Sequence, residues 1–136
     1  MGTWDVGTFD NDIAGDWAWE LETQPDTGFV SATLARVLDT GSDYLEVDTA
    51  CEGLAAAEVV ARLRGNWGAR NAYTESVDNW VVSHPRQPAP ELVAQAVAAV
   101  DRVLAEPSEL LELWSDSDEF AGWRAAVLDL RQRVAA

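Results

Sequence analysis

The sequence predicts an all-α fold: a single compact domain of six or seven helices, with one helix buried at its centre. Apolar residues recur at helical spacing in nearly every segment between turn-forming breaks. Residues 49–63 are apolar almost all the way round, which is typical of a buried helix. Residues 44–47 alternate like a short strand, but no partner strand is evident. The length of 136 residues suits one domain over residues 1–136.

Single apolar stripes predict the first two helices, over residues 12–23 and 27–39. In the first, Ile13, Trp17 and Leu21 lie at intervals of four residues and share one face. The stripe of the second helix consists of Val30, Leu34, Val37 and Leu38.

The central helix is predicted from about Thr49 to Leu63. Its few charged residues include Glu58 and Arg62, which are four residues apart and can pair on the helix surface. We expect this pair to occupy a narrow solvent-exposed edge of an otherwise buried helix.

Two helices follow a loop around residues 65–73. A short helix around Trp80 must end near His84, because Pro85 disfavours helical geometry in the residue before it. Pro90 suits the first position of the next helix, whose apolar stripe continues to Leu104.

The last two helices are predicted from their caps. Ser108 can cap a short helical turn that ends near Trp114. Residues 116–119, with the sequence Asp-Ser-Asp-Glu, resemble a capping box for the final helix. The apolar residues of that helix alternate by three and four: Phe120, Trp123, Val127, Leu130 and Val134.

The chain is strongly acidic, with 24 acidic residues against 9 basic ones, all arginine, and a formal net charge of −15. Such a charge argues against a binder of nucleic-acid phosphates and against an anionic membrane surface, so we expect neither as a partner. Residues 1–48 contribute −10 of the charge, with eleven acidic residues and one arginine. A partner steered by this field should be a cationic protein, although a merely solvated acidic surface is the simpler interpretation.

The densest polar cluster lies where the first helix begins. Asp12 and Asp16 are one helical turn apart, and Asp10 can reach the same region. Three converging carboxylates could hold Mg²⁺ or Ca²⁺, and no other cofactor is indicated. The spacing does not match a calcium-binding loop, however. The structural alternative is that Asp10 or Asn11 caps the helix and the acidic residues complement its dipole.

Seven tryptophans are a high count for a chain of this length. Those assigned to the core by their apolar stripes are Trp17, Trp80, Trp114 and Trp123. Trp4, Trp19 and Trp67 lie on no clear stripe, so they are candidate contacts for a ligand or partner, as is Asn11. Trp67 shares a loop with Asn66 and Arg70, where a stacking surface, an amide and a cation could meet one small ligand. The alternative is that Trp67 plugs the core.

Cys51 and His84 are the only thiol and the only imidazole. The helix dipole would lower the pKa of Cys51, which lies near the start of the central helix, so a nucleophilic pair with His84 is one hypothesis. The buried character of that helix argues against the pair. One cysteine forms no internal disulfide, the first residues lack signal-peptide features, and no apolar run could cross a bilayer. A cytoplasmic location is therefore expected.

Both ends of the chain show a family resemblance. Residues 4–17 match a W-G-x-G-x-F-x-N-D-x-A-x-D-W pattern at Trp4, Gly7, Phe9, Asn11, Asp12, Ala14, Asp16 and Trp17. This pattern resembles the start of a bacterial family catalogued as domain of unknown function 4259, although Asp5 stands where the pattern has glycine. Residues 108–114 are similar to the closing S-E-L-x-E-L-W segment of that family, which Trp123 follows. The resemblance implies a compact bacterial domain and supplies no activity.

The sequence favours a non-enzymatic domain that binds a cationic protein through its acidic N-terminal face, in the manner of an inhibitor or immunity protein. The alternative is an enzyme or ligand-binding protein that holds a divalent cation with Asp10, Asp12 and Asp16. A third possibility is a small-molecule pocket formed by the loop around Trp67.

Overall fold

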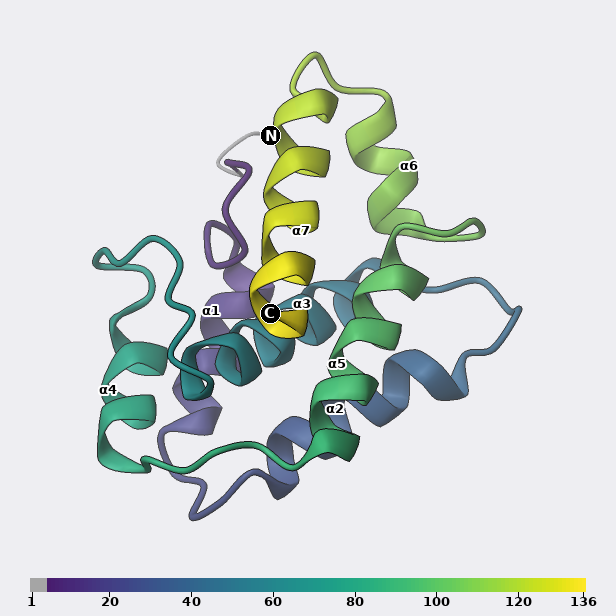
Figure 1. The fold of residues 1–136 in the computed structure, drawn as a ribbon. Helices are drawn as coiled ribbons and strands as arrows, with labels where there is room; N and C mark the ends of the chain where they lie inside the picture. The colour runs from purple at the N-terminus through teal and green to yellow at the C-terminus, as the bar shows by residue number, and fades with distance from the viewer. Residues whose placement is uncertain (1–4) are drawn as a thin grey trace.

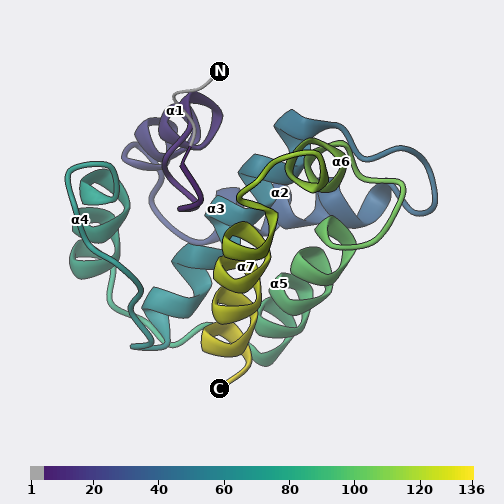
Figure 2. The ribbon, with the colours of Figure 1, turned by 90° about the horizontal axis from the view of Figure 1, so that it is seen from above.

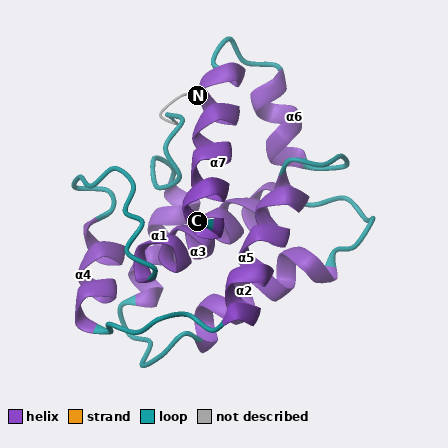
Figure 3. Ribbon diagram, viewed as in Figure 1, coloured by secondary structure: helices purple, strands orange, loops and turns teal. Residues whose placement is uncertain are grey.

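Each predicted apolar stripe corresponds to one helix in the computed structural model, which describes residues 5–136 and confirms the all-α prediction (Figures 1 and 3). The seven helices of this range are α1 (Asp12–Leu21), α2 (Gly28–Asp39), α3 (Val47–Leu63), α4 (Glu75–Ser83), α5 (Pro90–Val103), α6 (Glu109–Ser115) and α7 (Phe120–Ala135). Across residues 5–136, every helix is too short or too polar to span a bilayer.

Helix α3 is the centre of the molecule, as its sequence predicts. It packs against each of the other six helices. Figure 2 shows it between α1 and α4 on one side and α5 and α7 on the other. The prediction that Glu58 and Arg62 occupy a solvent-exposed edge is wrong, because these residues are only 6% and 2% exposed. The helices around α3 enclose this edge and supply the charged partners that burial requires.

A main-chain contact joins the start of α3 to the start of α6. Leu45 N donates to Pro107 O at 3.1 Å, and Glu109 N donates to Leu45 O at 2.8 Å. Within the described chain this is an isolated parallel bridge between Leu45 and Ser108, so the short strand-like signal at residues 44–47 does have a partner. Val47 N also donates to Glu109 Oε1 at 2.8 Å, which satisfies a free N–H of the first turn of α3.

The caps of the last two helices follow the prediction only in part. Ser108 caps α6 by accepting a hydrogen bond from Leu111 N. The predicted capping box of α7 is wrong, because that helix begins at Phe120 without a side-chain cap. Ser117 Oγ instead accepts from Glu119 N at 3.0 Å, and this turn reverses the chain between α6 and α7. The reversal lets Trp114 and Trp123 stack, with ring centroids 6.0 Å apart.

The four tryptophans assigned to the core are all buried, as predicted. Each indole that packs near α1 also finds a polar partner. Trp17 Nε1 donates to Thr33 Oγ1 at 2.9 Å, and its ring stacks on Phe29 with centroids 5.1 Å apart. Trp80 Nε1 donates to Gln24 O at 2.9 Å. These tryptophans therefore fix α1 against α2 and α4.

Two helix-interior glycines are expected to respond oppositely to alanine. A Cβ atom at Gly15 would meet nothing within 4 Å, so Gly15→Ala should stabilise the protein by about 0.5–1 kcal/mol through helix propensity. A Cβ atom at Gly53 would lie 2.5 Å from Val37 Cγ2, where α3 approaches α2. Gly53→Ala should therefore destabilise by about 1–3 kcal/mol, because the buried valine has no room to move.

Thermal and denaturant unfolding of the two variants test this pair. Stabilisation by both alanines would contradict the close approach of α2 and α3. Destabilisation by Gly15→Ala would contradict the open space at that position.

Candidate functional site

The N-terminal loop fixes the position of the acidic cluster. Asn11 caps α1, with its side-chain oxygen accepting from Ala14 N at 2.9 Å and its amide donating to Thr8 O at 3.3 Å. Asp10 does not cap the helix; it closes the preceding turn by accepting from Gly7 N at 3.0 Å. A side chain at Gly7 would collide with the Asp10 carboxylate. Asn11 is therefore the helix cap that the structural alternative predicted. Asp10 has a different structural role, which is to close the turn before the helix.

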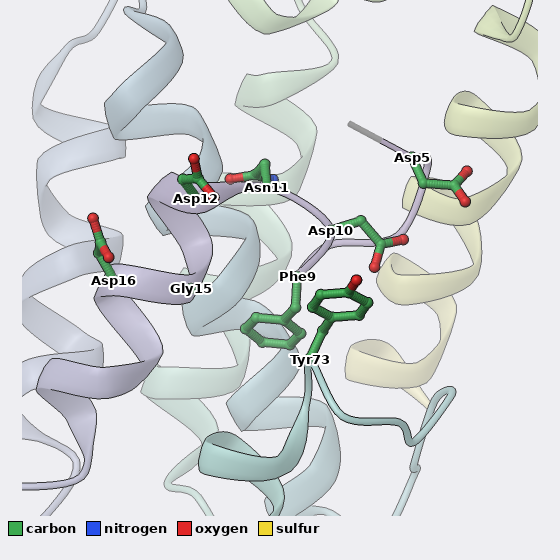
Figure 4. Close-up of a pocket in the computed structure, with 8 residues that line it drawn as sticks. All are labelled: Asp5, Phe9, Asp10, Asn11, Asp12, Gly15, Asp16 and Tyr73. Carbon is green, nitrogen blue, oxygen red and sulfur yellow. The ribbon is translucent and has the colours of Figure 1, made fainter. Parts of the chain in front are cut away.

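Four carboxylates line one open hollow of about 440 Å³ at this end of the molecule. Figure 4 shows Asp12 and Asp16 along α1 on one side, with Asp5 and Asp10 on the N-terminal loop on the other. The hollow has no basic residue among its described lining residues. We name it the acidic hollow. Its lining is completed by Phe9, Asn11, Gly15 and Tyr73.

The three predicted metal ligands share this hollow without forming a ligand set. In the described range, no group of three His, Cys, Asp or Glu side chains is placed to hold a metal ion. Asp10 is also engaged in its own turn. A cation site at Asp10, Asp12 and Asp16 thus stays a prediction for titration to test, and the geometry of the described residues does not support it.

One exposed face of α1 adjoins the acidic hollow. Asp12, Gly15, Asp16, Trp19 and Glu20 are all exposed and lie at positions i, i+3, i+4, i+7 and i+8, so they share a helix face. Trp19 is 75% exposed, which is unusual for so large an apolar side chain. Tyr73 brings a second aromatic ring to the same region, and that residue is 68% exposed. The region therefore combines negative charge with accessible aromatic surface.

The loop around Trp67 does not assemble the predicted three-residue ligand site. Asn66 turns its amide to Arg133 O at 2.9 Å, which anchors the loop to α7. Arg70 stacks on Trp67, with its guanidinium carbon 4.5 Å from the ring centroid. Trp67 is half-buried and packs on the core, and it lines a hollow that Asn66 and Arg70 do not line. Trp4 lies outside the described residues.

A buried ion-pair network lies behind the acidic hollow, and the sequence did not predict it. Arg62 Nε donates to Asp78 Oδ1 at 2.8 Å, while its two Nη atoms donate to Glu58 and to Ala69 O. Arg133 donates to both oxygens of Glu58, at 2.9 and 3.0 Å. Among the described residues, no buried side-chain nitrogen or oxygen lacks a hydrogen-bond partner. The network is therefore fully paired, as burial of charge requires.

The N-terminal loop connects the acidic hollow to this network. Thr8 Oγ1 donates to Glu58 Oε2 at 3.1 Å. The Phe9 ring lies 6.0 Å from the Arg62 guanidinium carbon and lines the acidic hollow as well. A smaller cavity of about 180 Å³ is lined jointly by loop residues 7–10 and by Glu58 and Arg133. One sequence signal could have revealed the network. A charged pair in a helix that is apolar almost all round has no solvent-exposed face, so its charges must pair with other buried polar groups.

The possible nucleophilic pair of Cys51 and His84 is not assembled. His84 Nδ1 lies 2.8 Å from Trp80 O, and its ring stacks on the indole of Trp80 with centroids 4.4 Å apart. Cys51 is buried in α3. Burial, followed by the nearby Asp48 and Glu52, raises the pKa of the thiol to about 12. The prediction that the helix dipole lowers the pKa of Cys51 is wrong, because the loss of hydration on burial raises this pKa.

Cys51 should accordingly react with iodoacetamide on the order of 100-fold or more slowly in the native protein than in guanidinium chloride. Its raised pKa means that folding favours the neutral thiol. This contribution to stability is present below the ordinary pKa of 9.0 and is lost as the pH rises toward 12. Mass spectrometry of timed alkylation measures the rates. Equal rates in the two states at pH 8 would contradict the buried thiol.

Comparison with known proteins supplies a family and no activity. No curated protein and no solved structure matches the chain. A family model described as "Domain of unknown function (DUF4259)" matches residues 2–126 of the 136, a range that includes the N-terminal loop, the acidic hollow and the first seven of the 16 residues of α7. The chain therefore belongs to the DUF4259 family, as its two terminal motifs predict.

Proposed function

We propose that the protein is a non-enzymatic binding domain whose acidic N-terminal face docks a cationic surface of another protein. The observation that carries this proposal is the acidic hollow, which four carboxylates line with no arginine among the described lining residues. Residues 1–48, which contain it, carry −10 of the net charge. Such a field raises the association rate of a cationic partner.

Exposed aromatic rings give the proposed face a means of holding the partner after encounter. Trp19 shares the exposed side of α1 with Asp12 and Asp16, and Tyr73 lines the acidic hollow. Tryptophan and tyrosine are enriched among interface residues that dominate binding energy, and their rings also attract arginine and lysine. A partner surface rich in arginine or lysine matches both features.

An inhibitor or immunity protein directed at a cationic toxin is the specific role that fits this chemistry. The buried, neutral thiol of Cys51 and the engagement of His84 with Trp80 support a binding role over nucleophilic catalysis. The net charge of −15 disfavours nucleic acid and anionic membranes as partners. A single buried cysteine suits a reducing compartment, so we place this action in the cytoplasm.

Two matched double variants test the proposal. Asp12→Asn with Asp16→Asn removes charge from the exposed face of α1. Asp116→Asn with Asp118→Asn removes the same charge from the exposed turn before α7. Each tagged protein is incubated with host lysate at low and high salt, and bound proteins are identified and ranked by their net charge.

We expect a cationic protein to bind the wild type and the Asp116/Asp118 variant at low salt and to be released at high salt. The Asp12/Asp16 variant should lose it while keeping its melting temperature, since Asn11 still caps α1. Recovery of no cationic protein, or equal loss by both variants, would count decisively against the proposal.

The divalent-cation alternative has its own readout. Mg²⁺, Ca²⁺ or Mn²⁺ bound at a hundred times its dissociation constant should stabilise the native state by about 2.7 kcal/mol. A metal-dependent rise in melting temperature that the Asp12/Asp16 variant abolishes would favour that alternative. Unchanged melting at millimolar metal would remove it.

A further inference from the structure

A second surface differs in charge from the acidic hollow and lies at the opposite edge of the molecule. In both Figures 1 and 2 the segment joining α4 to α5 lies in the lower part of the view, while the N-terminal loop lies in the upper part. Two open hollows of about 430 and 390 Å³ flank this segment. They share Arg64 and Gln87 as lining residues, so they adjoin at these two residues. We name the joined hollows the Arg64 groove.

The lining of the Arg64 groove is cationic and apolar. Arg64 and Arg86 contribute charge, and none of the described residues that line either hollow is acidic. This contrasts with a chain in which acidic residues outnumber arginines by 24 to 9. Arg86 is exposed, and no ion pair or hydrogen bond of its side chain is found among residues 5–136. Its charge is therefore available to a ligand.

Apolar walls extend from the charged middle of the groove in both directions. On one side lie Val82, which is 63% exposed, and Pro85. On the other lie Pro88, Val93 and Val97. The prolines fix the backbone of their segment, so this wall keeps its shape on binding and loses little entropy.

A carboxylate is the ligand group that Arg64 and Arg86 favour, because it accepts charge-assisted hydrogen bonds from a guanidinium.

We propose that the Arg64 groove binds an extended segment of a partner protein in which an acidic side chain lies between apolar side chains. The acidic side chain pairs with Arg64 and Arg86 where the hollows meet, and the flanking apolar side chains contact the two walls. An extended peptide fits better than a compact small molecule, because both hollows are open, whereas small-ligand sites enclose most of their ligand.

A competing explanation of Arg64 and Arg86 is that they only bind backbone carbonyl groups at helix C-termini. Arg64 Nη1 donates to Val134 O at 2.6 Å in the last turn of α7, so it has a structural role there. Arg86 has no such bond among the described residues, and its replacement should not alter stability. Arg86→Gln is therefore the informative variant. Arg124→Gln is the matched control, since Arg124 is an exposed arginine of α7 that does not line the groove.

The experiment selects random heptapeptides displayed on phage against the immobilised full chain. The most enriched peptide is then synthesised with blocked ends, together with a copy in which glutamine replaces its glutamate or asparagine its aspartate. Both peptides are titrated into ¹⁵N-labelled wild type, Arg86→Gln and Arg124→Gln, and the amide shifts are mapped by NMR. Melting temperatures of the three proteins are compared.

We expect selection of an acidic residue between apolar ones and shifts confined to residues 63–67 and 82–97. Affinity should fall about tenfold for the neutral peptide and for Arg86→Gln, and stay unchanged for Arg124→Gln. The proposal would be overturned if no peptide were enriched or if the shifts centred on α1. It would also be overturned if the neutral peptide bound equally well, or if Arg124→Gln weakened binding as much as Arg86→Gln. Binding of free benzoate as tight as that of the peptide would overturn it as well.

Discussion

Replacing Arg62 with methionine should lower the free energy of unfolding by about 3–5 kcal/mol. The guanidinium is buried between two carboxylates on different helices, Glu58 of α3 and Asp78 of α4. Methionine fills much of the same volume but leaves Asp78 and part of Glu58 as buried negative charges with too few donors. Each such group carries a desolvation cost that the native pairing offsets.

Arg36→Met is the matched control. Arg36 also pairs with a glutamate of α3, at 3.1 Å from Glu52, but its side chain is 52% exposed. Water and salt screen this pair, so its loss should cost less than about 1 kcal/mol. Guanidinium denaturation followed by tryptophan fluorescence gives the change in unfolding free energy for both variants, provided that the dependence of this free energy on denaturant concentration is unchanged. Equal costs for the two variants would show that the network around Glu58 does not stabilise the native state.

Truncation of two tryptophans in the same helix should separate packing from function. Trp17→Ala is expected to destabilise by about 3–5 kcal/mol, because it leaves a cavity between α1 and α2 and removes a partner of the Thr33 hydroxyl. Trp19→Ala should change stability by no more than about 0.5 kcal/mol, since its side chain faces solvent.

The second variant also tests the proposed partner face. A folded Trp19→Ala protein that fails to retain the cationic partner would assign binding energy to this ring. A loss of several kcal/mol of stability on Trp19→Ala would instead show that the exposed face of α1 is part of a core that extends beyond the described residues. Circular dichroism and denaturant unfolding distinguish these results.

Local periodicity was sufficient to predict the helices. The stripes around Trp17, Trp80 and Trp123 each require one buried face, and the breaks at Pro85 and Pro90 limit where helices can run. The beginning of α7 was mispredicted because residues 116–119 can form either a capping box or a tight turn. The choice between them is set by stacking of α6 on α7, which no local pattern encodes.

The partners within the network and the residues of the Arg64 groove could not be predicted from the sequence, because each depends on contacts between distant segments. Asp78 and Arg133 lie 16 and 75 residues from their partners Arg62 and Glu58. The local sequence around a charged helical residue does not indicate which residue of another helix will form its ion pair. The acidic cluster was different: Asp10, Asp12 and Asp16 are close in sequence, so one turn of helix was enough to predict that they share a region.

Glu58 ties together both ends of the described chain, since it accepts hydrogen bonds from Thr8 of the N-terminal loop and from Arg133 near the end of α7. During synthesis, Glu58 and Arg62 leave the ribosome long before Arg133 does. The charge network therefore cannot be complete until α7 has emerged. The carboxylate that anchors the N-terminal loop through Thr8 thus receives its last charged partner from a segment near the other end of the domain.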